Sequence, residues 1–160
     1  MPKNNITMAS KDAIAAKYGY CYLTIDNNRY LFMQAKDVSL TITKDKQRVD
    51  IMGKTMAGHK STGAEGTGKA KFHYNTSLMN EQLINYCKSG KDVYFDLQIT
   101  NDDPTSDAGR QTVTAYDCNL DGGIIAQIIS DNSLLEFDYD FTFDDCDLPE
   151  KFALLTGMQA

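Results

Sequence analysis

The stretch GAEGTGKA, from Gly63 to Ala70, comes nearest to a known chemistry. Two glycines four residues apart, followed by a lysine, are typical of a loop whose backbone amides bind nucleotide phosphates. Such a loop also needs a buried strand before it, a hydroxyl for magnesium and a helix after it. Ala70 stands in place of the hydroxyl, MAGHKST precedes the stretch where an apolar strand belongs, and KAKFHYN alternates as a strand. Nucleotide hydrolysis is therefore only the third of three hypotheses for function.

No other group of residues predicts catalysis, a cofactor or a metal. His59 and His73 are far apart and have no cysteine or acid at ligand spacing. Asp138, Asp140 and Asp144 share one face of a predicted strand, where calcium could bind, but they lack the loop spacing of a calcium site, and we interpret them as a solvated acidic face. No serine or cysteine lies in a nucleophile motif. We expect no enzyme and no cofactor.

The cysteines and the apolar runs indicate the compartment. The four cysteines lie far apart without zinc-site spacing, which favours buried free thiols in a reducing cytoplasm; they are Cys21, Cys87, Cys118 and Cys146. The first residues lack the apolar core of a signal peptide, and no apolar run has membrane-spanning length. We expect a soluble protein made in a bacterial cytoplasm, without a membrane partner.

Period-two alternation dominates the chain and predicts strands with one buried face. It is clear over residues 18–25 and over residues 136–143, where four aromatic residues alternate with polar ones. Asp26 to Asn28, which follow the first of these segments, predict a hairpin turn. A single helix is predicted after Thr76 or Ser77, ending at Gly90; its expected inward residues are Met79, Leu83, Tyr86 and Cys87. A hairpin turn is expected at Asp121 to Gly123. The fold class is mainly β: an antiparallel barrel or sandwich with one flanking helix.

The chain is expected to be one domain, residues 17–160, preceded by an N-terminal arm, residues 1–16. A glycine-rich segment, residues 54–68, is expected to be a long mobile hairpin loop that orders against a partner. The residues expected in this loop and at its start are Gly53, Lys54, Gly58, His59, Lys60, Gly63, Glu65, Gly66 and Gly68.

Charge divides the chain. Residues 1–75 hold 12 Lys/Arg and 6 Asp/Glu, and residues 76–160 hold 4 and 16, which together give the net charge of −6. If the halves form opposite faces, copies attract head to tail; if the strands interleave, the charges mix. The sequence leaves both arrangements open. The acidic half disfavours specific nucleic-acid binding.

Two segments are apolar on both faces, YLFM (Tyr30 to Met33) and IIAQII (Ile124 to Ile129). One helix covers only part of a sheet, so the remaining apolar surface requires a second sheet or another copy of the molecule. The strand residues expected to pack between subunits are Tyr30, Phe32, Ile125 and Ile129.

A series of segments resembles the tail tube proteins of the PBSX-like family, which build contractile phage tails and phage-tail-like bacteriocins. The segments are residues 8–38, the glycine-rich loop leading into GTGKAKFHYNTS (66–77), 92–113, DCNLDGGIIA (117–126) and DFTFDDCDLPEKF (140–152). The resemblance runs from Met8 onward, so residues 1–7 precede it.

The resemblance implies a β-barrel or sandwich that forms hexameric rings, stacked into a hollow tube. It implies that the glycine-rich loop reaches the adjacent ring, and that the partners are further copies, a sheath protein, baseplate tube-initiator proteins and a tape measure protein. We further expect Asp96, Asp138 and Asp140 to line the lumen, where like charge repels phosphates.

Two alternatives remain at this stage. A monomeric β-sandwich module that binds a glycan or peptide through the glycine-rich loop is the second hypothesis, and it differs from a tube protein in staying monomeric at high concentration. Secretion-system tube proteins share the architecture, so the fold alone does not separate them from a phage tail. The sequence also does not distinguish a phage from a DNA-free bacteriocin.

Overall fold

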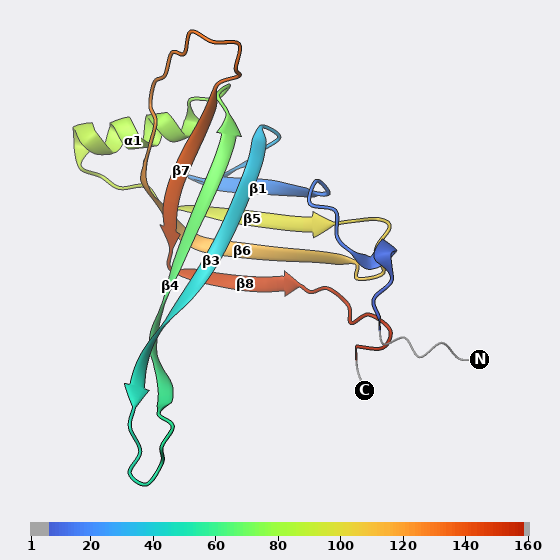
Figure 1. Cartoon of the computed structure of the whole chain (residues 1–160). Helices are drawn as coiled ribbons and strands as arrows, with labels where there is room; N and C mark the ends of the chain where they lie inside the picture. Colours follow the sequence, from blue (N-terminus) through green and yellow to red (C-terminus); the bar gives the residue numbers. More distant parts are fainter. Residues whose placement is uncertain (1–6, 159–160) are drawn as a thin grey trace. The chain divides into compact units, whose positions relative to one another are not determined.

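The computed structural model describes residues 7–158, which form two compact units (Figure 1). The first unit contains residues 7–33, 95–116 and 146–158, and the second contains residues 34–94 and 117–145. The described part of the chain is mainly antiparallel β-sheet with one α-helix, which confirms the expected fold class. Neither unit is continuous in sequence, since the chain passes between them four times. One of these passages lies within β6 (Arg110–Gly123), which contributes its first half to one unit and its second half to the other.

The first unit is a sheet in the order β2-β1-β5-β6-β8. Its other strands are β1 (Gly19–Ile25), β2 (Asn28–Leu31), β5 (Phe95–Asp102) and β8 (Asp145–Glu150), the last from Cys146 onward. The predicted turn between β1 and β2 is confirmed: Asp26 and Asn27 have φ of 50° and 64°, as a tight hairpin turn with two left-handed residues requires. The predicted alternation of β1 is confirmed by its buried side chains, Cys21, Leu23 and Ile25.

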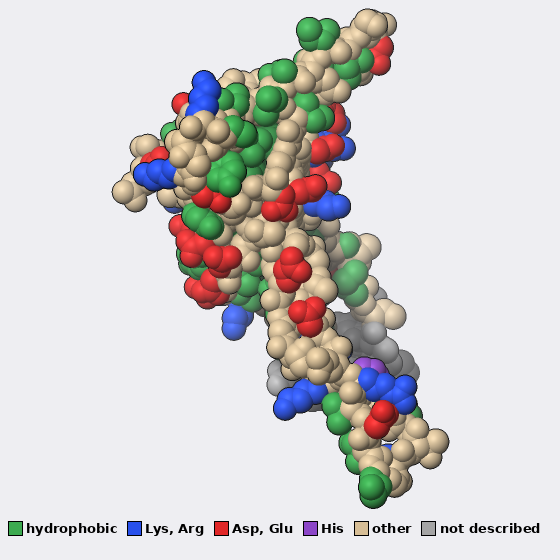
Figure 2. Space-filling view, turned by 90° about the vertical axis from the view of Figure 1, so that its left-hand side faces the viewer, with side chains coloured by type: hydrophobic (Ala, Val, Ile, Leu, Met, Phe, Trp, Pro, Cys, Tyr) green, Lys and Arg blue, Asp and Glu red, His purple; other side chains and the backbone are tan. Residues whose placement is uncertain are grey.

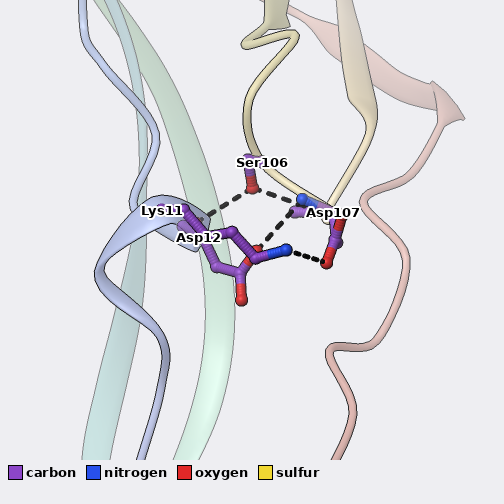
Figure 3. A network of polar contacts seen from close by, with 5 residues as sticks. Lys11, Asp12, Ser106 and Asp107 are labelled. Carbon is purple, nitrogen blue, oxygen red and sulfur yellow. Dashed lines mark hydrogen bonds and ion pairs between the residues drawn. The ribbon is translucent and has the colours of Figure 1, made fainter.

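The start of the chain is held against the loop between β5 and β6 by a clasp (Figure 3). The Ser106 hydroxyl donates to the Asp12 carbonyl at 3.0 Å, the Asp107 amide donates to the Asp12 carboxylate at 3.1 Å, and Lys11 pairs with Asp107 at 3.1 Å. The buried Asp103 carboxylate accepts the Ala15 amide at 2.9 Å. Of the predicted N-terminal arm, residues 1–6 lie outside the described residues, whereas Lys11, Asp12 and Ala15 are bound to their own unit.

The second unit is a sheet in the order β6-β7-β4-β3. Its strands are β3 (Ala35–Val49), β4 (Gly58–His73), β7 (Glu136–Phe143) and the second half of β6. β3 pairs with β4 from Ala35 to Val49, whereas β7 pairs with β4 only from Gly66 to His73. The predicted alternation of β7 is confirmed by its buried side chains, Phe137, Tyr139, Phe141 and Phe143.

The glycines of β4 make room for the aromatic rings of β7. Gly66 lies opposite Phe143 and Gly68 opposite Phe141. A Cβ at Gly68 would lie 2.2 Å from the ring of Phe141, and one at Gly66 would lie 2.4 Å from the ring of Phe143. Because both rings are buried, they cannot move aside without opening the core. These two glycines therefore serve packing in a strand and not phosphate binding.

The expected loop 54–68 is corrected by the structure, because residues 58–68 belong to β4 and only residues 50–57 connect the two strands. The prediction failed because glycine was interpreted as a sign of backbone freedom. The neighbouring strands make this segment a strand, because β3 supplies hydrogen bonds along the whole segment and β7 supplies aromatic rings.

The expected hairpin at Asp121 to Gly123 is also wrong. These residues end β6, with a register shift against β7 between Leu120 and Gly122. Ile124 to Ile129 then follow an irregular path and do not form the expected strand; Ile125 and Ile129 are exposed, and their packing between subunits stays a prediction. Gly123 lies opposite Tyr139, whose ring is 2.4 Å from a Cβ built there, so this glycine is also explained by packing.

The predicted helix is confirmed as α1 (Leu78–Ser89), followed by Gly90 in the left-handed conformation (φ 69°). Of its expected inward residues, Met79 is buried and Leu83 half-buried, but Tyr86 and Cys87 are exposed because only the first turn is fully covered. The side chain of Asn80 is buried in that turn. It donates to the Ile125 carbonyl at 3.2 Å and accepts the Tyr139 hydroxyl at 2.7 Å.

The glycine–aromatic packing predicts that Gly68→Ala destabilises the protein. The added methyl group meets a buried ring, and overpacking of this kind costs about 1–3 kcal/mol. The matched control is Gly63→Ala on the same strand, where a Cβ would lie 3.5 Å from the nearest heavy atom outside the adjacent residues, a carboxylate oxygen of Asp45. Urea unfolding measures both variants. Equal free energies of unfolding for the two variants would contradict the prediction, because they would show that the Phe141 ring moves aside without loss of stability.

The clasp predicts an acid-sensitive N-terminal segment. The amide hydrogen bonds from Ala15 and Thr105 lower the pKa of Asp103, so the folded state favours its carboxylate. This contribution is present above the ordinary carboxyl pKa of about 4 and is lost as pH falls through the lowered value. Hydrogen exchange should therefore show residues 13–18 losing protection below about pH 4. Asp103→Asn should remove the pH dependence, and an unchanged profile would contradict this assignment.

Candidate assembly surfaces

The pairing of β3 with β4 continues beyond β7 as a two-stranded ribbon, residues 43–65, which we call the arm. Figure 1 shows it extending from the sheet of the second unit. Its side chains are exposed on both faces; only Ala57 and Gly58 are half-buried. An isolated two-stranded ribbon is marginally stable in water. The arm is therefore a candidate surface for contact with another molecule.

The arm combines positive charge with apolar side chains near its tip (Figure 2). It contains five basic and three acidic residues, namely Lys44, Lys46, Arg48, Lys54 and Lys60 against Asp45, Asp50 and Glu65. At the tip, Met52 and Met56 are almost completely exposed, and Val49 and Ile51 are also exposed. Methionine is flexible and fits irregular apolar surfaces. The tip, residues 50–57, can thus contribute both apolar contact and charge complementarity.

The expected residues of the glycine-rich loop fall at two places. Gly53 (φ 83°) and Lys54 lie in the turn at the tip. The others lie on β4. Gly66 and Gly68 lie where β7 pairs with β4, and the remaining ones lie on the part of β4 that belongs to the arm: Gly58, His59, Lys60, Gly63 and Glu65. The structure thus distributes along a strand the residues that the sequence suggested were together in a loop.

The acidic face of β7 is interleaved with lysines of β4. Asp138 lies opposite Lys71, with carboxylate and ammonium 3.8 Å apart, and Asp140 lies opposite Lys69. Glu136 pairs with Lys36, and this contact lowers the pKa of Glu136. In this sheet, therefore, the strands interleave and the charges of the two halves of the sequence mix.

The remaining predicted site residues belong to different elements. Asp96 is half-buried on β5, and Tyr30 is exposed on the edge strand β2. Phe32 follows β2 and is buried within the first unit, so it packs the subunit's own core and not a neighbour. Ile125 and Ile129 lie on the exposed segment between β6 and β7.

The structure offers little for small-molecule chemistry. Gly63 to Ala70 form a paired strand, so their amides do not converge on a phosphate. Among residues 7–158, no three His, Cys, Asp or Glu side chains are grouped as metal ligands. Within the same residues no helix is long and apolar enough to cross a membrane.

The fold is shared with chains of contractile injection particles. A chain of the anti-feeding prophage baseplate has a TM-score of 0.65 and is 11% identical, with 88% of this chain and 97% of that chain covered. A chain of the extracellular contractile injection system called PVC, from its sheath/tube terminator, has a TM-score of 0.61 and is 12% identical, with coverage of 89% and 100%. At these identities the likeness shows the fold alone.

The sequence comparisons define the family. Residues 6–150 match the family described as phage tail tube protein. Phage-like element PBSX protein XkdM of Bacillus subtilis (strain 168) is 38% identical over 148 residues, which cover 92% of this chain and 98% of the relative. The chain belongs to the phage tail tube protein family.

Sequence reasoning missed several residues of these surfaces. Met52 and Met56 were not singled out, although two methionines beside a glycine turn are a visible signal. The lysines that face the acidic strand, Lys69 and Lys71, gave no sequence signal, because cross-strand neighbours depend on register.

Proposed function

We propose that this chain is the structural subunit of a hollow tail tube, in which copies form hexameric rings that stack on one another. The observation that carries the proposal is the arm, because a ribbon exposed on both faces has no internal reason to remain ordered. Family membership supports the same function. The subunit acts mechanically, as a rigid conduit, and not as an enzyme.

Free strand edges support ring closure. Among residues 7–158, no strand pairs with the outer side of β3 in the second unit or with the outer side of β2 in the first. An unpaired edge offers a row of backbone hydrogen-bonding groups to another chain. Pairing between unlike edges of successive copies is a heterologous contact, which closes into a ring when the rotation allows it. Tyr30 on β2 would lie at such a contact.

The arm is the element proposed to bridge successive rings. Its positive charge and exposed methionines suit a contact with a different surface of the next copy. Asp96, Asp138 and Asp140 remain the residues proposed for the lumen, with Lys69 and Lys71 beside the last two. The further partners proposed are a sheath protein, baseplate tube-initiator proteins and a tape measure protein, after synthesis in a bacterial cytoplasm.

The prediction concerns removal of the arm. A variant in which residues 47–60 are replaced by Asn-Gly keeps the pairs nearer the sheet and replaces the tip with a short turn. It should unfold with about the stability of the intact chain, because the removed side chains are exposed or half-buried, but it should form no tubes. Thermal unfolding and negative-stain electron microscopy measure the two properties.

The control replaces only Met52 and Met56 by Gln, which retains the arm and lowers its apolar area. This variant should form tubes at a higher protein concentration than the intact chain. Tubes of normal length from the arm-deleted variant would contradict the role of the arm. An intact chain that stays monomeric at every concentration would instead favour a monomeric binding module.

A further inference from the structure

A shallow groove of about 320 Å³ lies between α1 and the end of β6 in the second unit. The helix and the residues after it contribute one wall, and β6 contributes the other. Its lining residues are Gln82, Leu83, Tyr86, Asp92, Val93, Asn119, Leu120 and Asp121. Tyr86 is half exposed, so the groove has an accessible aromatic surface.

One residue that lines the groove has an unused hydrogen-bond donor. Asn119 is half-buried, but its side-chain nitrogen itself is buried and has no hydrogen-bond partner among residues 7–158. Buried amide groups without partners are rare in folded proteins, and each one requires an explanation. Rotation of this amide group toward the groove would present the donor to an incoming segment in an irregular conformation, whose backbone carbonyls are not used by a strand or a helix.

Charge selects the kind of segment. Asp92 and Asp121 line the groove, and no lysine or arginine is among its lining residues. An acidic, partly apolar groove suits a segment with a cation and flexible apolar side chains. The tip of the arm has this composition, with Lys54 between Met52 and Met56, and its turn leaves carbonyls outside the ladder of β3 and β4.

The groove and the tip of one copy are separated by the length of the ribbon. Figure 1 shows α1 at one end of β3 and β4 and the tip at the other. A copy therefore cannot place its tip in its own groove. A tip that enters the groove of the next copy gives a head-to-tail contact, which repeats without limit along an axis.

We propose that the groove between α1 and β6 is the receptor for the arm tip of a second copy, with Asn119 donating to a tip carbonyl and Asp92 and Asp121 facing Lys54. The inference rests on the proposed tube function and adds the site at which successive copies interlock.

Cross-linking tests the contact directly, because Cys87 is exposed on α1 next to Tyr86. A cysteine introduced as Met56→Cys should react with Cys87 of the next copy through a short bis-maleimide, giving a ladder of covalent oligomers from assembled tubes. Cys87→Ser in the same chain should abolish the ladder. Met158→Cys, exposed in the first unit, should not replace Met56→Cys.

The outcomes distinguish the groove assignment from the proposed tube function. Tubes that form with Met56→Cys but give no ladder dependent on Cys87 overturn the groove assignment and leave the tube function intact. A wild-type chain that forms no tubes, judged by electron microscopy, overturns the tube function and the groove assignment with it.

A second test uses Asn119→Leu, which keeps the approximate shape and removes the unpartnered donor. Stability in urea should be unchanged or higher, because an unsatisfied buried group is lost, whereas the protein concentration needed for tubes should rise about fivefold, as expected for one lost contact of about 1 kcal/mol. A residue with only a structural role would lower stability and assembly together. That result would overturn the assignment.

Reversing the charges completes the test. Lys54→Glu should also raise the required concentration about fivefold, and Asp121→Lys in the same chain should restore assembly, since the attraction is recreated with opposite signs. Failure of the double variant to assemble better than Lys54→Glu would contradict the pairing. Lys60→Glu, on β4 outside the tip, is the matched control and should have a smaller effect.

Discussion

The packing of aromatic rings on glycines between β7 and β4 is the constraint on which the second unit depends. Phe141 and Phe143 cover Gly68 and Gly66, and the rings fill the core where side chains of β4 would otherwise stand. This packing fixes the register of the two strands, because a slip of one residue would place a ring against a larger side chain. The same register places Lys69 and Lys71 opposite the acidic residues of β7 on the other face.

The end of that packing marks where the subunit stops stabilising itself. From Gly58 to Glu65, β4 pairs with β3 and not with β7, and the side chains of the arm are solvent-exposed on both faces. A cooperative core needs more than one ribbon. The arm is thus held mainly by the pairing of β3 with β4, and its exposed side chains are candidates for contact with another molecule.

The N-terminal clasp and the groove beside α1 show opposite uses of polar groups. In the clasp, the Asp12 and Asp103 carboxylates accept backbone amides, and the start of the described chain is fixed to its own unit. In the groove, the amide nitrogen of Asn119 has no partner within the subunit. Polar groups with hydrogen-bond partners stabilise a fold, whereas a buried polar group without a partner requires an explanation.

The sequence by itself determined the local structure and the family: alternating residues defined β1 and β7, Asp26 and Asn27 defined the turn between β1 and β2, and Gly90 ended α1. The alternation, the turn and the helix end each depend on a few neighbouring residues, which is why the sequence predicts them. Only the tertiary structure decided that the glycine-rich segment is a strand, that Ile125 and Ile129 are not, and that lysines stand beside Asp138 and Asp140. Each of these depends on which distant strand lies opposite, and pairing partners and register are set by packing across the sheet, not by the local sequence.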